Sequence, residues 1–345
     1  MSTRRRRLLP ALLLALGLIA ALAAPAGAQA KPVLLRLGYF PNVTHASAIV
    51  GVERGIFKKE LGRNRLATRS FNAGPEAIEA LFSGAIDATY IGPSPAINAW
   101  VQSKAVKIVS GATSGGALLV VNRNIDDVDG LKGKKVATPQ LGGTQDVAAR
   151  YYFKTQGLKT DRNGGGDISI VPQPNGQTLT AFRSGQIQGA WLPEPWATRA
   201  VQEAGAKVLL DERQLWPKRR FVTTHLIVSA KFLKEHPDVV EQLLKGQIAA
   251  NDYLRTNTAD AKAAVDKGIE KVTGQGISAK VLDASFKNLD FTNDPIASTL
   301  EPNADHAVSV GLLSKPNLKG IYNLGPLNTL LKAAKLPTVS DGGLG

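Results

Sequence analysis

The 345-residue sequence contains no cysteine and only four histidines. Without cysteine the chain can form no disulfide, no thiolate nucleophile and no thiolate metal site. It also offers no cysteine for lipid attachment. The histidines, His45, His225, His236 and His306, are scattered and show no metal-ligand spacing. The sequence therefore predicts no metal centre and no cofactor.

Short motifs that carry catalytic chemistry are also missing. The sequence has no G-x-x-x-x-G-K-[ST] phosphate loop, no G-x-G-x-x-G, no G-x-S-x-G, no S-x-x-K and no H-E-x-x-H. We therefore expect no catalytic residue and a protein that is not an enzyme.

The first 30 residues show the pattern of a secretory signal peptide. Four arginines at 4–7 precede an apolar run at 8–22, and small residues ending in Ala28-Gln29-Ala30 supply a cleavage site. A membrane anchor is the alternative, but the apolar run is shorter than the ~20 residues that span a bilayer. We expect cleavage after Ala28 or Ala30 and a periplasmic protein without a lipid anchor.

The chain that remains after cleavage has about 315 residues, which is enough for two domains. Its formal net charge falls from +14 to about +10, because the signal segment carries the four arginines. Excess positive charge can indicate nucleic-acid binding, but an exported protein does not meet that partner. We expect no nucleic-acid partner, a monomer, and a basic surface that attracts small anions.

Strand and helix patterns alternate along the chain. Predicted strands at 34–40, 68–72, 86–91, 106–110 and 117–121 are interleaved with predicted helices at 45–59, 75–82 and 95–101. The pattern restarts with strands at 136–138, 168–171 and 188–192 and helices at 144–155 and 177–183. After residue 225 it becomes almost wholly helical. Such alternation predicts an α/β protein with sheets flanked by helices.

An internal similarity supports two equivalent halves. Ser83-Gly84 matches Ser184-Gly185 at an offset of 101 residues, and each pair joins a predicted helix to a predicted strand. A proline-bearing turn follows both strands. Two equivalent α/β lobes explain this match, and chance similarity of two ordinary helix–strand units is the alternative.

The predicted lobes are 31–117 with 226–345, and 118–225. Two apolar extended runs, at 117–122 and 221–229, lie at the lobe boundaries, and we interpret them as paired hinge strands. Ligands of open α/β sheets sit beyond the carboxyl ends of the strands. The loops at those ends would therefore form one cleft between the lobes.

Several predicted helices begin in turns of small, hydroxyl or amide residues, at 41–45, 72–76, 92–95 and 140–145. Uncovered N–H groups at the positive end of a helix dipole suit an oxyanion. The alternative is that these residues are ordinary helix caps and turn residues. Convergence of several such turns on one cleft favours anion binding.

Two residues near the end of a second-lobe strand have open interpretations. Trp191 is a candidate for covering the apolar part of a ligand, with core packing as the alternative. Glu194 is a candidate acceptor for a ligand ammonium group, or equally a contact between the lobes or with a transporter.

These segments resemble a known family. Residues 37–46 (LGYFPNVTHA), 71–77 (FNAGPEA), 91–96 (IGPSPA) and 191–196 (WLPEPW) are similar to the aliphatic sulfonate/nitrate/taurine family of ABC-transporter solute-binding proteins. The resemblance implies a type II periplasmic-binding-protein fold, with two lobes of mixed sheets flanked by helices and joined by two hinge strands. It implies that the lobes close on a small-molecule ligand and deliver it to a membrane permease.

The resemblance also implies ligand contacts in matching turns. They are Asn42, Thr44 and His45 in the first turn, Gly74 and Pro75 in the second, Ser94 in the third, Ser114, Gly115 and Gly116 before the first hinge strand, and Gly143, Thr144 and Gln145 in the second lobe. No basic side chain falls in these turns, so backbone N–H groups would carry anion recognition.

The predicted ligand is a small organic anion, such as an aliphatic sulfonate or a taurine-like compound. Nitrate, bicarbonate or an aromatic or pyrimidine solute is the main alternative, and Tyr39, Phe40 and Trp191 keep the aromatic one open. A sensor domain with the same clamp is a further alternative. Thiamine-pyrimidine synthases are similar to this family but depend on a cysteine-rich motif, which this chain lacks.

Overall fold

The computed structural model describes residues 31–345, and the predicted signal segment lies outside the described residues. The chain divides after residue 33, and every helix and strand named below belongs to the second, compact unit, residues 34–345. Among the described residues, no helix combines the length and the apolar character needed to cross a membrane.

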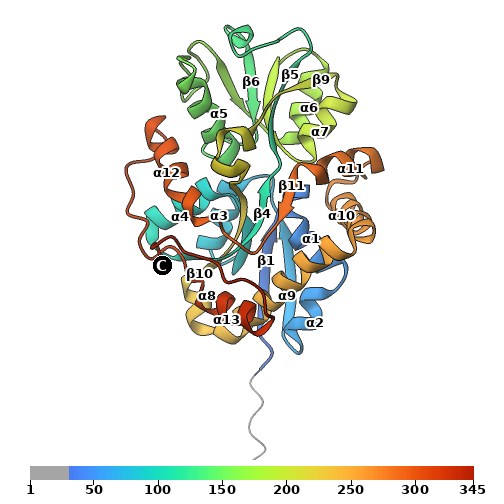
Figure 1. The fold of residues 1–345 in the computed structure, drawn as a ribbon, viewed down its shortest axis with the longest axis vertical. Helices are drawn as coiled ribbons and strands as arrows, with labels where there is room; N and C mark the ends of the chain where they lie inside the picture. Colours follow the sequence, from blue (N-terminus) through green and yellow to red (C-terminus); the bar gives the residue numbers. More distant parts are fainter. Residues whose placement is uncertain (1–30) are drawn as a thin grey trace, which may run out of the picture. The chain divides into compact units, whose positions relative to one another are not determined.

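Two mixed sheets organise the second unit (Figure 1). The six-stranded sheet has the order β11 (Leu289–Phe291), β4 (Val106–Gly115), β10 (Val222–Ser229), β3 (Ala88–Ile91), β1 (Leu34–Tyr39), β2 (Arg65–Ser70). The five-stranded sheet has the order β7 (Ser169–Pro172), β6 (Lys135–Thr138), β8 (Gly189–Pro193), β5 (Ala117–Asn122), β9 (Ala206–Asp211). We call the first sheet with its helices lobe 1 and the second with its helices lobe 2. The predicted α/β class with two mixed sheets is confirmed.

Helices flank both sheets. Lobe 1 contains α1 (Ala46–Glu53), α2 (Ile56–Leu61), α3 (Gly74–Phe82), α4 (Pro93–Ser103), α8 (Ala230–Glu235), α9 (Pro237–Thr256), α10 (Thr258–Thr273), α11 (Ala279–Lys287), α12 (Leu300–Ser309) and α13 (Gly325–Ala333). Lobe 2 contains α5 (Thr144–Thr155), α6 (Asn175–Arg183) and α7 (Trp196–Glu203). The tail after β10 returns to lobe 1, where α9 and α10 pack on α1 and α9 also packs on α2.

The two sheets share one strand order. Sheet order β2-β1-β3-β10-β4 in lobe 1 corresponds to β7-β6-β8-β5-β9 in lobe 2. The matching turns also agree in detail: the hydroxyls of Ser83 and Ser184 each donate to a carbonyl three residues earlier at 3.1 Å. Gly84 and Gly185 have φ of 71° and 72°, which glycine adopts without strain. The internal similarity seen in the sequence is therefore structural.

The chain crosses between the sheets twice. The first crossing follows β4 at Gly115 and Gly116, whose φ values of 76° and 75° let the backbone turn sharply into β5. The second runs from β9 to β10 through two short 3-10 helices, η3 (Glu212–Leu215) and η4 (Pro217–Arg219). The boundary predicted at residue 226 therefore falls inside β10.

The prediction that the two apolar runs pair with each other is wrong. Strand β5 pairs with β8 and β9, whereas β10 pairs with β3 and β4, all antiparallel. Each run enters a different lobe and completes that lobe's sheet. Both strands are nearly fully buried because sheet and helices cover them on both faces.

Two further differences concern the ends of elements. The helix predicted over 45–59 divides into α1 and α2 at Gly55, whose φ is 67°. The tail predicted as helical also contains β11, which joins the edge of the first sheet beside β4. The helix predicted over 144–155 has the predicted bounds.

Lobe 2 has a hydrophobic core on each face of its sheet. Leu119 and Val121 of β5 face one core together with Phe153 of α5, and Leu118 and Val120 face the other with helices α6 and α7. This alternation follows from the two-residue period of a strand. A sheet covered on both faces holds the loops at its carboxyl edge in fixed positions.

Candidate ligand-binding cleft

A small cavity of ≈ 30 Å³ lies between the two lobes. Its walls come from the loops that follow β1, β2 and β3 in lobe 1 and β6, β7 and β8 in lobe 2, together with the start of β10. They are formed by Phe40, Asn42, Thr44, His45, Asn72, Ala73, Gly74, Gly92, Pro95, Pro139, Gly143, Thr144, Gln145, Asn175, Pro193, Thr223 and Thr224. The cavity therefore lies where open α/β sheets bind ligands.

Helix starts from both lobes converge on this cavity. Lobe 1 contributes Gly74 of α3 and Gly92 before α4, and lobe 2 contributes Thr144 of α5 and Asn175 of α6. The first N–H groups of an α-helix have no intrahelical partner and lie at the positive end of its dipole. The walls thus present hydrogen-bond donors and positive potential without an arginine or lysine.

His45 is a neutral wall of the cavity. Burial lowers the pKa of its imidazole to about 3. Its Nδ1 accepts a 3.3 Å hydrogen bond from the Phe40 N–H, and the two rings stack with centroids 4.3 Å apart. The ring proton therefore resides on Nε2, which leaves a neutral donor on the imidazole.

The turn before α1 is held from three sides. The carbonyl of Thr44 accepts hydrogen bonds from the hydroxyls of Thr113 at 2.7 Å and Thr224 at 3.0 Å. The Val43 N–H donates to the carbonyl of Glu194 in lobe 2 at 2.9 Å. Lobe 1 therefore holds this turn through two hydroxyls, and lobe 2 adds one main-chain hydrogen bond where the lobes are in contact.

The start of α5 approaches lobe 1 very closely. A Cβ placed on Gly92 would lie 2.1 Å from Oγ1 of Thr144, so with Thr144 in this position and the lobes together only glycine fits there. Gly92 has φ of −75°, which any residue can adopt. The glycine is therefore required by the close approach and not by its backbone conformation.

Half of the predicted contact residues line this cavity. They are Asn42, Thr44, His45, Gly74, Gly143, Thr144 and Gln145. Pro75 and Ser94 lie in the first turns of α3 and α4 beside it, and the buried Ser94 hydroxyl has no hydrogen-bond partner among the described residues. Ser114, Gly115 and Gly116 form the end of β4 and the first crossing, where the backbone carbonyls of the two glycines bond to Thr223 and Glu194.

Trp191 does not reach the cavity, and its assignment as a ligand contact is corrected. Its side chain is fully buried in the lobe 2 core, where Nε1 donates to Oε2 of Glu212 at 2.7 Å. Burial raises the pKa of the Glu212 carboxyl to about 7. Trp191 is a core residue, as the alternative interpretation proposed.

Glu194 is likewise absent from the cavity wall. Its carboxylate is fully buried and accepts hydrogen bonds from Thr198 in lobe 2 and from Ser285 and Asn288 in lobe 1. These contacts occupy both oxygens, so the carboxylate is not presented to a ligand ammonium group. The alternative interpretation, a contact between the lobes, describes its position.

Asn175 is a cavity residue that sequence reasoning missed. It is the first residue of α6, is nearly buried, and its Oδ1 has no hydrogen-bond partner within residues 31–345. The internal similarity could have identified it, because the offset of 101 residues places Asn175 opposite Gly74. Thr223 and Thr224 were missed because they were assigned to a hinge strand.

A wider groove of ≈ 800 Å³ adjoins the cavity. Asn42, Asn72 and Asn175 line both spaces, and the groove extends over α6 to Trp196 and Arg199. Arg199 lies over the Trp196 ring, 5.0 Å from its centroid. The groove is thus the polar exterior of the same interlobe space. Within residues 31–345 no group of three or more His, Cys, Asp or Glu side chains is placed to hold a metal ion.

Residues 28–267 match the NMT1-like family. The chain belongs to the NMT1-like family. Over 231 residues it is 29% identical to the taurine-binding periplasmic protein of Escherichia coli (strain K12). The aligned region covers 66% of this chain and 69% of that protein. This relative supports the family that the sequence motifs resemble.

Two solved structures share the fold. The alkanesulfonate-binding protein SsuA of Xanthomonas axonopodis pv. citri, bound to MOPS, aligns with a TM-score of 0.69 at 21% identity, over 83% of this chain and 96% of SsuA. The nitrate-binding protein NrtA of Synechocystis PCC 6803 aligns with a TM-score of 0.73 at 16% identity, over 89% and 90% of the two chains. This NMT1-like chain therefore has a periplasmic-binding-protein fold.

Proposed function

We propose that this protein is the periplasmic solute-binding component of an ABC importer. It captures a small organic anion, an aliphatic sulfonate or a taurine-like compound, between lobes 1 and 2 and delivers it to a membrane permease. It performs no chemistry on the solute. Export by a cleaved signal peptide and a monomeric state belong to the same proposal.

The cavity wall carries this proposal. It combines helix starts from both lobes with hydroxyl and amide side chains and contains no ionised side chain among the described residues. A site of this kind binds an anion through backbone N–H groups and helix dipoles. Neutral donors also release their ligand more readily than a buried ion pair would, which suits a carrier that must give up its solute.

The solutes of a relative and of a structural neighbour support the proposed solute class. The taurine-binding periplasmic protein of Escherichia coli is a relative of this chain, and SsuA shares its fold. Taurine and MOPS both carry a sulfonate group. A sulfonate has three oxygens and one negative charge, which suits a wall that offers several N–H and O–H donors.

A smaller inorganic anion, nitrate or bicarbonate, is the second candidate. The observation in its favour is the volume of ≈ 30 Å³, well below the roughly 300–1,000 Å³ of common small-molecule sites. An aromatic solute has less support, because Trp191 lies in the core and Phe40 is the only aromatic side chain other than His45 among the wall residues.

A thermal-shift panel tests the proposal. It should contain alkanesulfonates, taurine, nitrate, bicarbonate, aromatic acids and pyrimidines at graded concentrations. A solute that binds only the folded protein at about 100 times its Kd stabilises it by about 2.7 kcal/mol. We expect a sulfonate to raise Tm most. A shift only with nitrate or bicarbonate supports the second candidate. A shift only with aromatic acids contradicts a sulfonate solute, and a shift only with uncharged pyrimidines contradicts anion binding.

A further inference from the structure

Glu194 is a buried carboxylate that both lobes hold. From lobe 2 it accepts the Thr198 N–H at 3.1 Å and the Thr198 hydroxyl at 2.8 Å. From lobe 1 it accepts the Ser285 hydroxyl at 3.0 Å and the Asn288 side-chain amide at 2.7 Å. Two donors therefore come from each lobe, and the lobe 1 donors belong to the end of α11.

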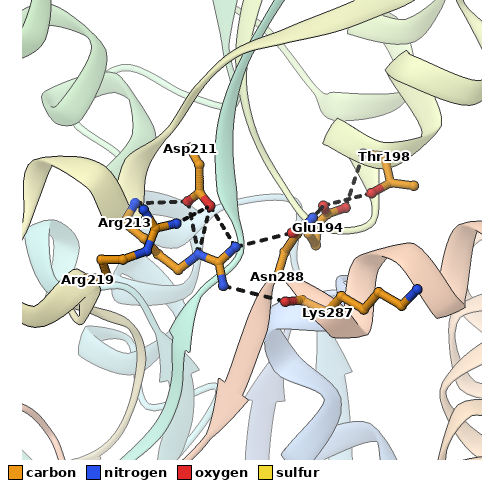
Figure 2. A network of polar contacts seen from close by, with 7 residues as sticks. All are labelled: Glu194, Thr198, Asp211, Arg213, Arg219, Lys287 and Asn288. Carbon is orange, nitrogen blue, oxygen red and sulfur yellow. Dashed lines mark hydrogen bonds and ion pairs between the residues drawn. The ribbon is translucent and has the colours of Figure 1, made fainter.

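Asn288 connects this carboxylate to an arginine (Figure 2). While its Nδ2 donates to Glu194, its Oδ1 accepts from Nη2 of Arg213 at 3.3 Å. Arg213 belongs to η3, on the second crossing between the lobes, and its Nη1 also lies 3.5 Å from the carbonyl of Lys287. The side-chain amide of Asn288 in lobe 1 thus connects Glu194 of lobe 2 with Arg213 of the second crossing.

Arg213 is fixed in this position by its own neighbour. Its Nε donates to Oδ1 of Asp211 at 3.1 Å and its Nη2 to Oδ2 at 2.6 Å, and Asp211 also accepts Nη2 of Arg219 at 3.4 Å. A bidentate arginine–carboxylate pair holds both side chains in one geometry. Arg213 is therefore preorganised to meet Asn288 when the lobes approach.

All these contacts lie outside the ligand cavity. None of Glu194, Asn288 and Arg213 lines it, yet the Glu194 main chain reaches the cavity loops: its N–H donates to Gly116 and its carbonyl accepts from Val43. Side chain and main chain of one residue therefore contact α11, the first crossing and the first cavity turn.

We propose that Glu194, Asn288 and Arg213 form an interlobe latch that sets the balance between open and closed forms of the protein. Separation of the lobes removes two of the four donors from the Glu194 carboxylate and exposes it to water. Closure restores them at the cost of desolvation. Because the gain and the cost are of similar size, a latch of this type favours closure without locking it. The inference rests on the proposed function only in that closure serves solute capture.

Glu194→Gln is the main test of the latch. Glutamine keeps the size of the side chain but has one acceptor oxygen in place of two, and its amide hydrogens then face donors in the same pocket. Asn288→Ala removes the lobe 1 side of the bridge and leaves the Glu194–Thr198 contacts intact. Because Asn288 is only half-buried at the end of α11, this second variant keeps the test readable if Glu194→Gln does not fold.

The absence of native cysteine allows a direct measurement of lobe separation. Spin labels on Gln177→Cys in α6 and Gln275→Cys after α10 lie on opposite walls of the outer groove. Pulsed electron double resonance then gives the distance distribution between the lobes in the unliganded protein. We expect both latch variants to raise the ratio of open to closed molecules by about tenfold.

Glu212→Gln is the matched control. Glu212 is another buried carboxylate, but the Trp191 indole that donates to it lies in the lobe 2 core and not in lobe 1. We expect its distance distribution to match that of the parent protein. Unchanged distributions in both Glu194→Gln and Asn288→Ala would overturn the latch, as would an equal shift in Glu212→Gln. Because no solute is added, the result stands whether or not a sulfonate binds.

Discussion

The indole Nε1 of Trp196 donates a 2.7 Å hydrogen bond to Oδ1 of Asn42. Trp196 begins α7 in lobe 2, whereas Asn42 precedes the first helical turn of lobe 1, and both side chains are nearly buried. Asn42 lines both the cavity and the outer groove. This bond therefore joins the two lobes at the boundary between the cavity and the groove.

Trp196→Phe removes this bond while keeping an aromatic ring. We expect the solute that stabilises the protein most to bind about five- to tenfold more weakly, because Oδ1 of Asn42 loses its partner in the closed form. Isothermal titration calorimetry measures the change. Trp100→Phe is the control, since Nε1 of Trp100 donates to the Asn317 carbonyl within lobe 1. Equal affinity losses in the two variants would contradict a role of the Trp196 bond in closure.

Gly92→Ala tests the close approach of the lobes. The added Cβ would lie 2.1 Å from Oγ1 of Thr144, so the lobes must stay apart or Thr144 must turn away. We expect at least about tenfold weaker solute binding with little change in the Tm of the unliganded protein, because overpacking here strains only the closed form. Gly325→Ala, where no atom lies closer than 4.0 Å to the new Cβ, is the control. Parent-like affinity in Gly92→Ala would show that closure does not need this contact.

Much of the architecture could be predicted because the same helix–turn–strand pattern occurs in both lobes. The offset of 101 residues joins Ser83-Gly84 to Ser184-Gly185, and the structure gives these turns the same geometry. The strands that pair with β5 and β10, which follow the two crossings, could not be predicted. Strands β5 and β10 are both buried on two faces, so neither has an alternating pattern that identifies its sheet.

The cavity was predicted in part for similar reasons. Turns after parallel strands were identified as helix starts, and those of α3 and α5 do line the cavity. Trp191 was misassigned because β8 is buried on both faces, so its sequence carries no sign of the direction of the side chain. Asn175 was missed because the predicted start of α6 was two residues late.

Glu212 predicts a loss of stability as the pH rises from 4.5 to 7. Its pKa is about 7 in the folded protein, above the ordinary 4.5, because burial disfavours the carboxylate. The neutral form therefore contributes stability that is complete below pH 4.5 and is lost as pH rises through 7. At pH 8 the cost is roughly 3 kcal/mol. Glu212→Gln stays neutral and keeps an acceptor for Trp191, so urea unfolding should show it more stable than the parent at pH 8. Its advantage should vanish near pH 4.5, and a gap independent of pH would contradict the assignment.

His45 predicts a loss of stability in acid. Its folded-state pKa is about 3, below the ordinary 6.5, because the buried imidazole is not solvated when charged. The unfolded chain therefore binds a proton that the folded chain excludes, and stability falls as pH drops below 6.5. For this one group the loss between pH 7 and pH 5 is roughly 2 kcal/mol.

His45→Asn isolates this contribution from those of His225 and His306, whose pKa values burial also lowers to about 4. We expect the variant to lose roughly 2 kcal/mol less than the parent between pH 7 and pH 5 in urea unfolding. Between pH 7 and pH 8 the two stability curves should run parallel, because His45 is neutral in both folded and unfolded chains there. Parallel curves down to pH 5 would show that the imidazole of the folded protein takes up its proton over the same pH range as in the unfolded chain. That result would give the cavity a cation, and an anionic solute would then bind more tightly as the pH falls.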